Sequence, residues 1–172
     1  MASSIQIIKG ELQKINIIAE DINYKDLSFD RVELEANQIK IKFKLTNKEL
    51  NFKNNPIINF KLSLSDDSLK TVLLSKNWSW IGSRICKDIL NMEKLEDIKL
   101  RNDKLLIKGY KNNMNNNLEE QINIKAEKGK IYLENKNYNK TIQVPMENKI
   151  YIENINIENN LIKISANSSL SF

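Results

Sequence analysis

Two tryptophans two residues apart, Trp78 and Trp80, are the side chains of this sequence best suited to contact an interface. On a helix, residues with that spacing point about 200° away from each other, so that one can face the core while the other faces solvent. Regular helical spacing places Trp80 beside Arg84 and Lys87 on the polar side. An exposed indole next to cations suits the headgroup region of an anionic membrane, or a hydrophobic patch on a partner protein.

The same spacing puts Trp78 on an apolar stripe, and stripes of this kind usually face the core. Gly82 lies near the stripe, where its missing side chain would let a sheet approach closely. The other members of the stripe are Ile81, Ile85, Ile89 and Met92. For Trp80 an alternative stays open: if the helix begins later, for instance capped by Ser79, the indole simply packs at a loop corner.

The positive charge of the chain is concentrated in one segment. The net charge is +5, and residues 38–61 carry an equal excess, with six lysines and one acid. Alternation places Lys40, Lys42 and Lys44 on one face of a strand. Three interpretations compete: a solvated face that also discourages edge pairing, an anionic membrane surface, and nucleic acid. Nucleic acid is the weakest, because no aromatic side chains are interleaved with the lysines for base stacking.

Most catalytic chemistry is excluded by the residue types that are missing. There is no histidine, which removes the usual general base and every histidine metal site. The single cysteine, Cys86, excludes an internal disulfide and any multi-cysteine metal cage. Ser79 and Ser83 have no histidine to activate them, and paired carboxylates leave only a minor glycosidase alternative. We therefore expect no enzyme, no cofactor and no metal.

The sequence also lacks membrane-targeting features. No apolar run approaches the ~18 residues that a membrane-spanning helix needs. The first ten residues do not have the layout of a signal peptide. We therefore expect a cytoplasmic protein, or one that rests on a membrane surface without crossing it.

Strict alternation of apolar and polar residues dominates the chain and predicts half-buried antiparallel strands. Before the tryptophans, the segments with this pattern are 12–22, 27–36, 39–45 and 58–64. After the tryptophans, strand pairs are expected around turns at Asn102 and Asp103, at Lys128 and Gly129, and at Asn159 and Asn160. The asparagine-rich run at 112–117 is interpreted as a polar loop.

The period changes at Ser65, which is followed by two acidic residues and so resembles a helix start. We expect a helical segment at about 66–91, broken near 75–77. The predicted fold is α+β in a single domain over 1–172: about eight or nine strands in a curved, mostly antiparallel sheet wrapped over the central helical segment.

Several soft motifs resemble the LmeA-like phospholipid-binding family, in particular its cyanobacterial members. They are a Gly-Glu-Leu at 10–12 leading into 15–26, Leu-Ser-Asp-Asp-Ser-Leu at 64–69, Trp-Ser-Trp-Ile at 78–81, and the apolar segment 105–108. The resemblance extends over nearly the whole chain, and the family's first helix would lie upstream of Met1. It implies non-catalytic binding of a phospholipid or another membrane lipid.

This resemblance suggests a particular site. We expect acyl chains to lie in an apolar groove between sheet and helix, because lipid sites need apolar walls and a few polar groups at the mouth. The expected groove residues are Leu73, Leu74, Trp78, Ile81, Ile85 and Ile89. The expected headgroup and membrane-surface residues are Trp80, Arg84, Lys87, Lys40, Lys42 and Lys44. The rival hypothesis is a protein-interaction module that uses the exposed tryptophan and the basic strand face. The oligomeric state and the identity of the lipid stay open.

Overall fold

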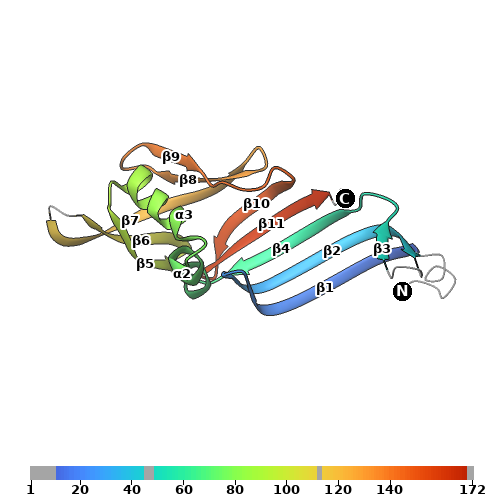
Figure 1. Ribbon diagram of the computed structural model, residues 1–172. Coiled ribbons are helices and arrows are strands. Elements are labelled where there is room, and N and C mark those ends of the chain that lie inside the picture. Colours follow the sequence, from blue (N-terminus) through green and yellow to red (C-terminus); the bar gives the residue numbers. More distant parts are fainter. Residues whose placement is uncertain (1–10, 45–48, 112–113, 170–172) are drawn as a thin grey trace.

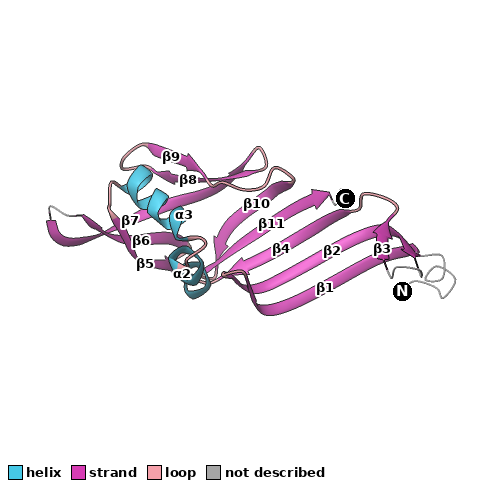
Figure 2. Cartoon of the chain, in the orientation of Figure 1, coloured by secondary structure: helices cyan, strands magenta, loops and turns pink. Residues whose placement is uncertain are grey.

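The computed structural model describes residues 11–44, 49–111 and 114–169. These residues form two antiparallel β-sheets, two short α-helices and one π-helical turn, so the predicted α+β class and the antiparallel pairing are confirmed (Figures 1 and 2). The long first sheet lies at one end of the molecule, and the second sheet and the helices lie at the other end (Figure 1).

The first sheet has five strands in a row and one short strand off the row. Its order is β1 (Glu11–Tyr24), β2 (Leu27–Lys44), β4 (Ile57–Leu64), β11 (Leu161–Ser169) and β10 (Ile150–Glu158). The short strand β3 (Glu49–Phe52) pairs with the end of β2. The segments 27–36 and 39–45, which the alternation predicts as two strands, lie in one strand up to Lys44, and Leu45 lies outside the described residues.

The second sheet is a meander of consecutive strands. It comprises β5 (Lys94–Arg101), β6 (Lys104–Lys111), β7 (Met114–Glu127), β8 (Lys130–Asn135) and β9 (Lys140–Gln143). The predicted polar loop at 112–117 is wrong from Met114 onward, because that part of the backbone begins β7.

The prediction of one curved sheet wrapped over the helices is therefore wrong. Alternation shows which side of a strand is apolar, but it does not show which strand is its neighbour. Strands joined by short turns pair with their neighbours in the sequence, so β5–β9 form a separate sheet. Only the last hairpin, β10–β11, returns to pair with β4. Within the described part of the chain, neither sheet is curled or closed.

The hairpin turns follow the sequence closely. Four hairpin turns each contain two consecutive residues with positive φ. These pairs are Lys25 and Asp26, Asn102 and Asp103, Lys128 and Gly129, and Asn159 and Asn160. Two positive φ values in succession are what a two-residue type I′ turn requires, and its twist matches that of the flanking strands. The last three turns stand where the sequence predicts them.

The helical segment begins and breaks where predicted. It consists of α2 (Asp66–Leu74), α3 (Ser79–Arg84) and the π-helix η1 (Ile85–Leu90). Ser65 caps α2, because its side chain accepts a hydrogen bond from the Ser68 amide and its hydroxyl donates to Asp30 on β2 at 2.9 Å. A Cβ added at Gly82 would lie 2.8 Å from Leu95 Cδ2 and 3.0 Å from the Leu73 carbonyl, so this glycine does permit the predicted close approach.

The hydrophobic core lies where the second sheet and the helices cover one end of the first sheet. Leu64, Ile155 and Ile162 of the first sheet pack there with Ile107 and Ile122 of the second sheet. Helix α2 packs on both β2 and β5. Each fully buried aliphatic side chain contributes about 1.5–3 kcal/mol, so this end carries most of the stabilising burial.

We predict that Ser65→Ala lowers the free energy of unfolding by about 1–2 kcal/mol, because it removes both the helix cap and the hydroxyl that bonds Asp30. Urea unfolding followed by circular dichroism measures this loss. Ser68→Ala, in the first turn of the same helix, is the matched control and should cost less than about 0.5 kcal/mol. Equal losses in the two variants would contradict the capping role.

Candidate apolar binding site

An apolar cavity of about 240 Å³ lies between the covered end of the first sheet, the second sheet and the helices. Its lining consists only of leucine, isoleucine and valine side chains. The first sheet contributes Leu27, Leu64, Ile155, Ile162 and Ile164. The second sheet contributes Leu105, Ile107, Ile124, Ile131 and Leu133, with Val144 just after it. The helices contribute Leu69, Val72, Leu73, Ile81 and Ile85.

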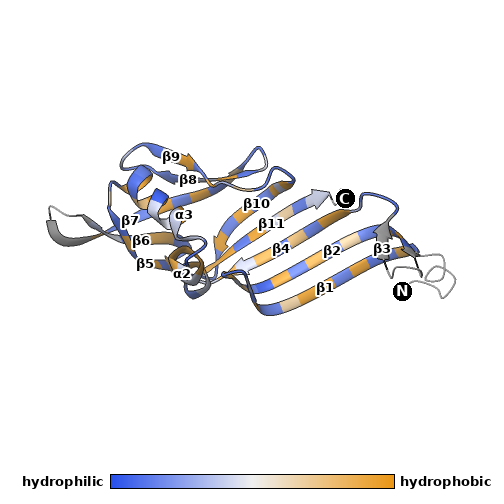
Figure 3. Ribbon diagram, viewed as in Figure 1, coloured by the Kyte–Doolittle hydropathy of each residue, from blue (hydrophilic) through white to orange (hydrophobic). Residues whose placement is uncertain are grey.

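The apolar face of the first sheet continues beyond this cavity. Directly paired residues on antiparallel strands point to the same side of the sheet. The register therefore places rows of apolar residues across the strands, such as Leu34, Phe60 and Ala166. Figure 3 shows the alternation of apolar and polar residues along these strands.

At the uncovered end, the same face forms a second apolar pocket of about 140 Å³. Its lining residues are Ile15, Ile17, Leu34, Ala36, Ile39, Pro56 and Ile58. Ile17 is 50% exposed, which is unusual for an isoleucine on the apolar face of a sheet. An apolar surface thus runs from the cavity along the sheet to its far end.

Two backbone irregularities keep this face apolar. Asp21 on β1 and Gln38 on β2 have positive φ inside their strands. Apolar positions are spaced by three residues instead of two across each of them, for instance from Ala36 to Ile39, and both of these residues line the second pocket. Without such a shift, Ile39 would lie on the polar face.

The structure brings three of the six predicted groove residues to the cavity wall: Leu73, Ile81 and Ile85. Ile89 is fully buried in the core and is not part of the lining. Leu74 is 47% exposed and belongs neither to the core cluster nor to the cavity lining.

Trp78 also lies away from the cavity lining. It is half-buried, and its indole N–H donates to the Lys25 carbonyl at 3.0 Å. Helix α3 begins one residue later, at Ser79, so Trp78 occupies the N-cap position without a capping side-chain bond, and the helical stripe does not include it. Its observed contact is with the β1–β2 turn.

The predicted surface cations lie at two separate places. Trp80 is 44% exposed on α3, with Arg84 and Lys87 also exposed near it. The Arg84 guanidinium donates to Asp88 at 3.2 Å, which offsets part of its charge. Lys40 and Lys42 are exposed near the opposite end of the molecule, where β2 ends (Figure 1). The side chain of Lys44 lies outside the described residues.

The lining residues on the second sheet and on β10–β11 are not among those predicted from the sequence. The signal is present in their alternating apolar positions, for instance Leu105 and Ile107, or Ile162 and Ile164. Alternation alone does not show that these strands face one common space, because that depends on which strands pair.

An ion pair joins the helical wall of the cavity to the second sheet. The Lys70 ammonium on α2 lies 2.7 Å from the Asp97 carboxylate on β5. The hydrogen bond from Lys70 lowers the pKa of Asp97 below its ordinary value of 3.8. Elsewhere, burial raises the pKa of Cys86 to about 11, so its thiol stays protonated and unreactive at neutral pH.

We predict that the Lys70–Asp97 pair makes stability depend on pH in the acid range. A lowered pKa in the folded state means that the contribution of Asp97 is present above its unfolded pKa and is lost as pH falls through the folded value. The difference in unfolding free energy between wild type and Asp97→Asn should therefore shrink below about pH 4. Urea titrations between pH 7 and pH 2.5 measure it. Glu96→Gln, the exposed neighbour on β5, is the control; a pH-independent difference for Asp97→Asn would contradict the assignment.

The fold and site thus define an α+β protein with an aliphatic cavity between two antiparallel sheets. Comparison with protein-family models, with curated proteins and with solved structures found no match. None of the helices in the described ranges has the length and apolar character to cross a membrane. The resemblance to the LmeA-like family therefore stays a prediction from sequence motifs.

Proposed function

We propose that the protein binds a phospholipid or a similar membrane lipid without catalysis, with an acyl chain in the apolar cavity. The observation that carries this proposal is the composition of the cavity wall, which is aliphatic throughout. A wall without a hydrogen-bonding side chain penalises any polar ligand atom by several kcal/mol, so the part of the ligand that enters must be hydrocarbon. The predicted groove of a lipid-binding fold is thus supported at this place, although the predicted wrapped sheet is not what forms it.

The size of the cavity favours part of one acyl chain. Its volume of about 240 Å³ exceeds that of an engineered cavity of ~150 Å³ that accepts benzene, but it is below the ~300–1,000 Å³ of sites for drug-sized ligands. A lipid with two chains therefore cannot enter completely. The remaining hydrocarbon would lie along the uncovered apolar face of the first sheet, ending at the second pocket.

The apolar face is long enough for an acyl chain of the length found in one membrane leaflet. The eight residues of β4 span about 26 Å at about 3.3 Å per residue. Half of a ~30 Å hydrocarbon core is about 15 Å, so an acyl chain can extend from the cavity along β4 without leaving apolar surface. Lys40 and Lys42 are exposed at the far end of β2, on the face opposite Ile39, so a headgroup that extends past the end of the sheet would lie near them, whereas Arg84 and Lys87 lie at the other end.

A second candidate is a protein-interaction module. The exposed Trp80 favours it, because tryptophan is enriched among the residues that dominate protein interfaces. The aliphatic cavity lies on the inner side of the helices and has no part in such a contact. The two functions therefore differ in which residues they need.

We predict that Ile81→Phe weakens binding of a fluorescent fatty acid such as cis-parinaric acid, because the larger ring fills the cavity from the helical wall. Leu74→Phe is the matched control: Leu74 was expected in the same groove but lies outside the lining, so its variant should bind like wild type. Ile164→Phe fills the cavity from the opposite wall and should weaken binding as well. Because Ile164 lies on β11, this loss cannot be attributed to a change in the packing of helix α3. Equal affinities for all four proteins, or no binding by wild type, would contradict the proposal.

We predict that the protein co-sediments with liposomes that contain anionic phospholipid and that Lys40→Ala/Lys42→Ala weakens this binding about 30-fold, at ~1 kcal/mol per lysine. Lys94→Ala/Lys136→Ala, on β5 and in the β8–β9 turn of the second sheet, is the control of equal charge. Equal and negligible binding to anionic and neutral liposomes would rule out the membrane contact. An unchanged affinity of the first variant would exclude these two lysines.

A further inference from the structure

The strand β1 presents a long open edge. It is the last strand in its row, and within the described ranges no strand pairs with its outer side. On this strand Ile17 and Ile18, which point to opposite faces of the sheet, are 50% and 52% exposed. Proteins protect such edges with short strands, proline, charged residues or bulges. β1 has 14 residues and no proline, but it does carry charged residues and an irregularity at Asp21, so pairing requires a partner that matches both.

The opposite edge of the same sheet, strand β10, contacts the second sheet. There the backbone N–H of Ile152 on β10 donates to the Gly129 carbonyl in the β7–β8 turn at 3.0 Å. The second sheet thus contacts β10, and β1 is the edge that stays open (Figure 1).

The sequence of β1 is complementary to itself in one antiparallel register. A two-fold axis perpendicular to the sheet at Ile17 keeps each residue on its own face of the sheet. This axis places Ile15 opposite Ala19 of a second copy, and Leu12 opposite Ile22 of that copy. All of these positions belong to the apolar side, because their partners on β2, such as Ala36 and Ile39, line the second pocket or continue its rows.

The irregularities of the strand match in the same register. The regular pairing of β1 with β2 is interrupted at two places, where Gln13 lies opposite Gln38 and where Asp21 lies opposite Asp30. At each place one of the two residues, Gln38 or Asp21, has positive φ. The two-fold axis at Ile17 places Asp21 opposite Gln13 of the second copy. In this register a residue with positive φ, Asp21, lies opposite a residue with ordinary φ, Gln13, as in the β1–β2 pair. The irregular positions of the two β1 strands therefore coincide.

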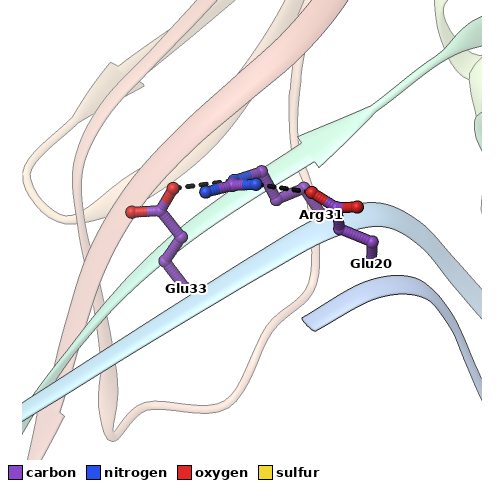
Figure 4. Close-up of polar contacts among 3 residues, drawn as sticks. All are labelled: Glu20, Arg31 and Glu33. Atoms are coloured by element: carbon purple, nitrogen blue, oxygen red, sulfur yellow. Dashed lines mark hydrogen bonds and ion pairs between the residues drawn. The ribbon is translucent and has the colours of Figure 1, made fainter. Parts of the chain in front are cut away.

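The charges on the polar face are also complementary. Figure 4 shows Arg31 of β2 between two carboxylates, Glu20 at 2.6 Å and Glu33 at 2.8 Å. Lys14 of β1 lies 2.6 Å from Glu35. The axis at Ile17 brings Lys14 opposite Glu20 of the second copy, which joins the two clusters into a row of alternating charge.

Neighbouring registers lose this agreement. Moving the axis by one residue to Asn16 places Leu12 opposite Glu20, and moving it to Ile18 places Lys14 opposite Ile22. Each alternative sets an apolar-side residue against a polar-side residue, which the alternation of strand faces does not allow.

From these observations we propose that the protein forms a symmetric dimer in which two β1 strands pair antiparallel about Ile17. The two rows of five strands become one continuous sheet, and the open apolar faces of the two copies lie side by side. The pairing uses the backbone edge of β1 and complementary side chains on both of its faces, so the dimer forms without bound lipid.

Charge reversal with rescue tests the register. Wild-type protein should be a dimer in sedimentation equilibrium at micromolar concentrations. Lys14→Glu and Glu20→Lys should each raise the dimer dissociation constant about tenfold or more, because each places like charges opposite each other at two symmetric contacts. The double variant Lys14→Glu/Glu20→Lys should have a dimer dissociation constant close to that of the wild type. Within one copy these residues are six apart on a strand, about 20 Å, so rescue cannot arise inside a monomer.

Cysteine cross-linking provides an independent readout. Ile17→Cys should form a disulfide-linked dimer under mild oxidation, whereas Ile57→Cys, at a 59% exposed position at the start of β4, should not. The native Cys86 is fully buried and does not compete. A monomeric wild type, a double variant without rescue, or equal cross-linking at both positions would each overturn the proposal.

Discussion

The constraint on which the rest of the structure depends is the apolar face of the first sheet, which is longer than the elements that cover it. The second sheet and the helices pack on one end only, where Leu64 and Ile162 join the core. Even there, the covering side chains leave a cavity of about 240 Å³. Beyond it the apolar face continues to the second pocket, where Ile17 is half-exposed and Ile39 is buried. Exposed apolar side chains on a sheet face, such as Ile17, favour the binding surface proposed above.

Local features were predictable because they depend on a few adjacent residues. The cap at Ser65, the break after α2 and three type I′ turns follow from side-chain chemistry that acts within four residues. The division into two sheets was not predictable in this way, because the strands after the helices have the same alternation as those before them. The position of Trp78 depended on a single residue: α3 begins at Ser79, so the indole leaves the helical stripe and bonds the β1–β2 turn.

The same distinction explains how much of the candidate site could be foreseen. The helical wall was partly visible, since Leu73, Ile81 and Ile85 follow helical spacing. The sheet walls were hidden, because they come from seven strands whose pairing brings distant residues together. The cations were visible as residue types, but only the structure shows that Lys40 and Lys42 lie near the opposite end from Arg84 and Lys87 (Figure 1). The basic residues Lys40 and Lys42 therefore lie at the end of the first sheet that is farthest from the cavity.

The central claim is that hydrocarbon occupies the cavity between the two sheets. Nuclear Overhauser contacts between a bound acyl chain and selectively labelled isoleucine methyl groups test it most directly. The account predicts contacts from the chain terminus to Ile107 and Ile162, on opposite walls of the cavity. Contacts confined to the exposed surface around Trp80, with none to either wall, would contradict it.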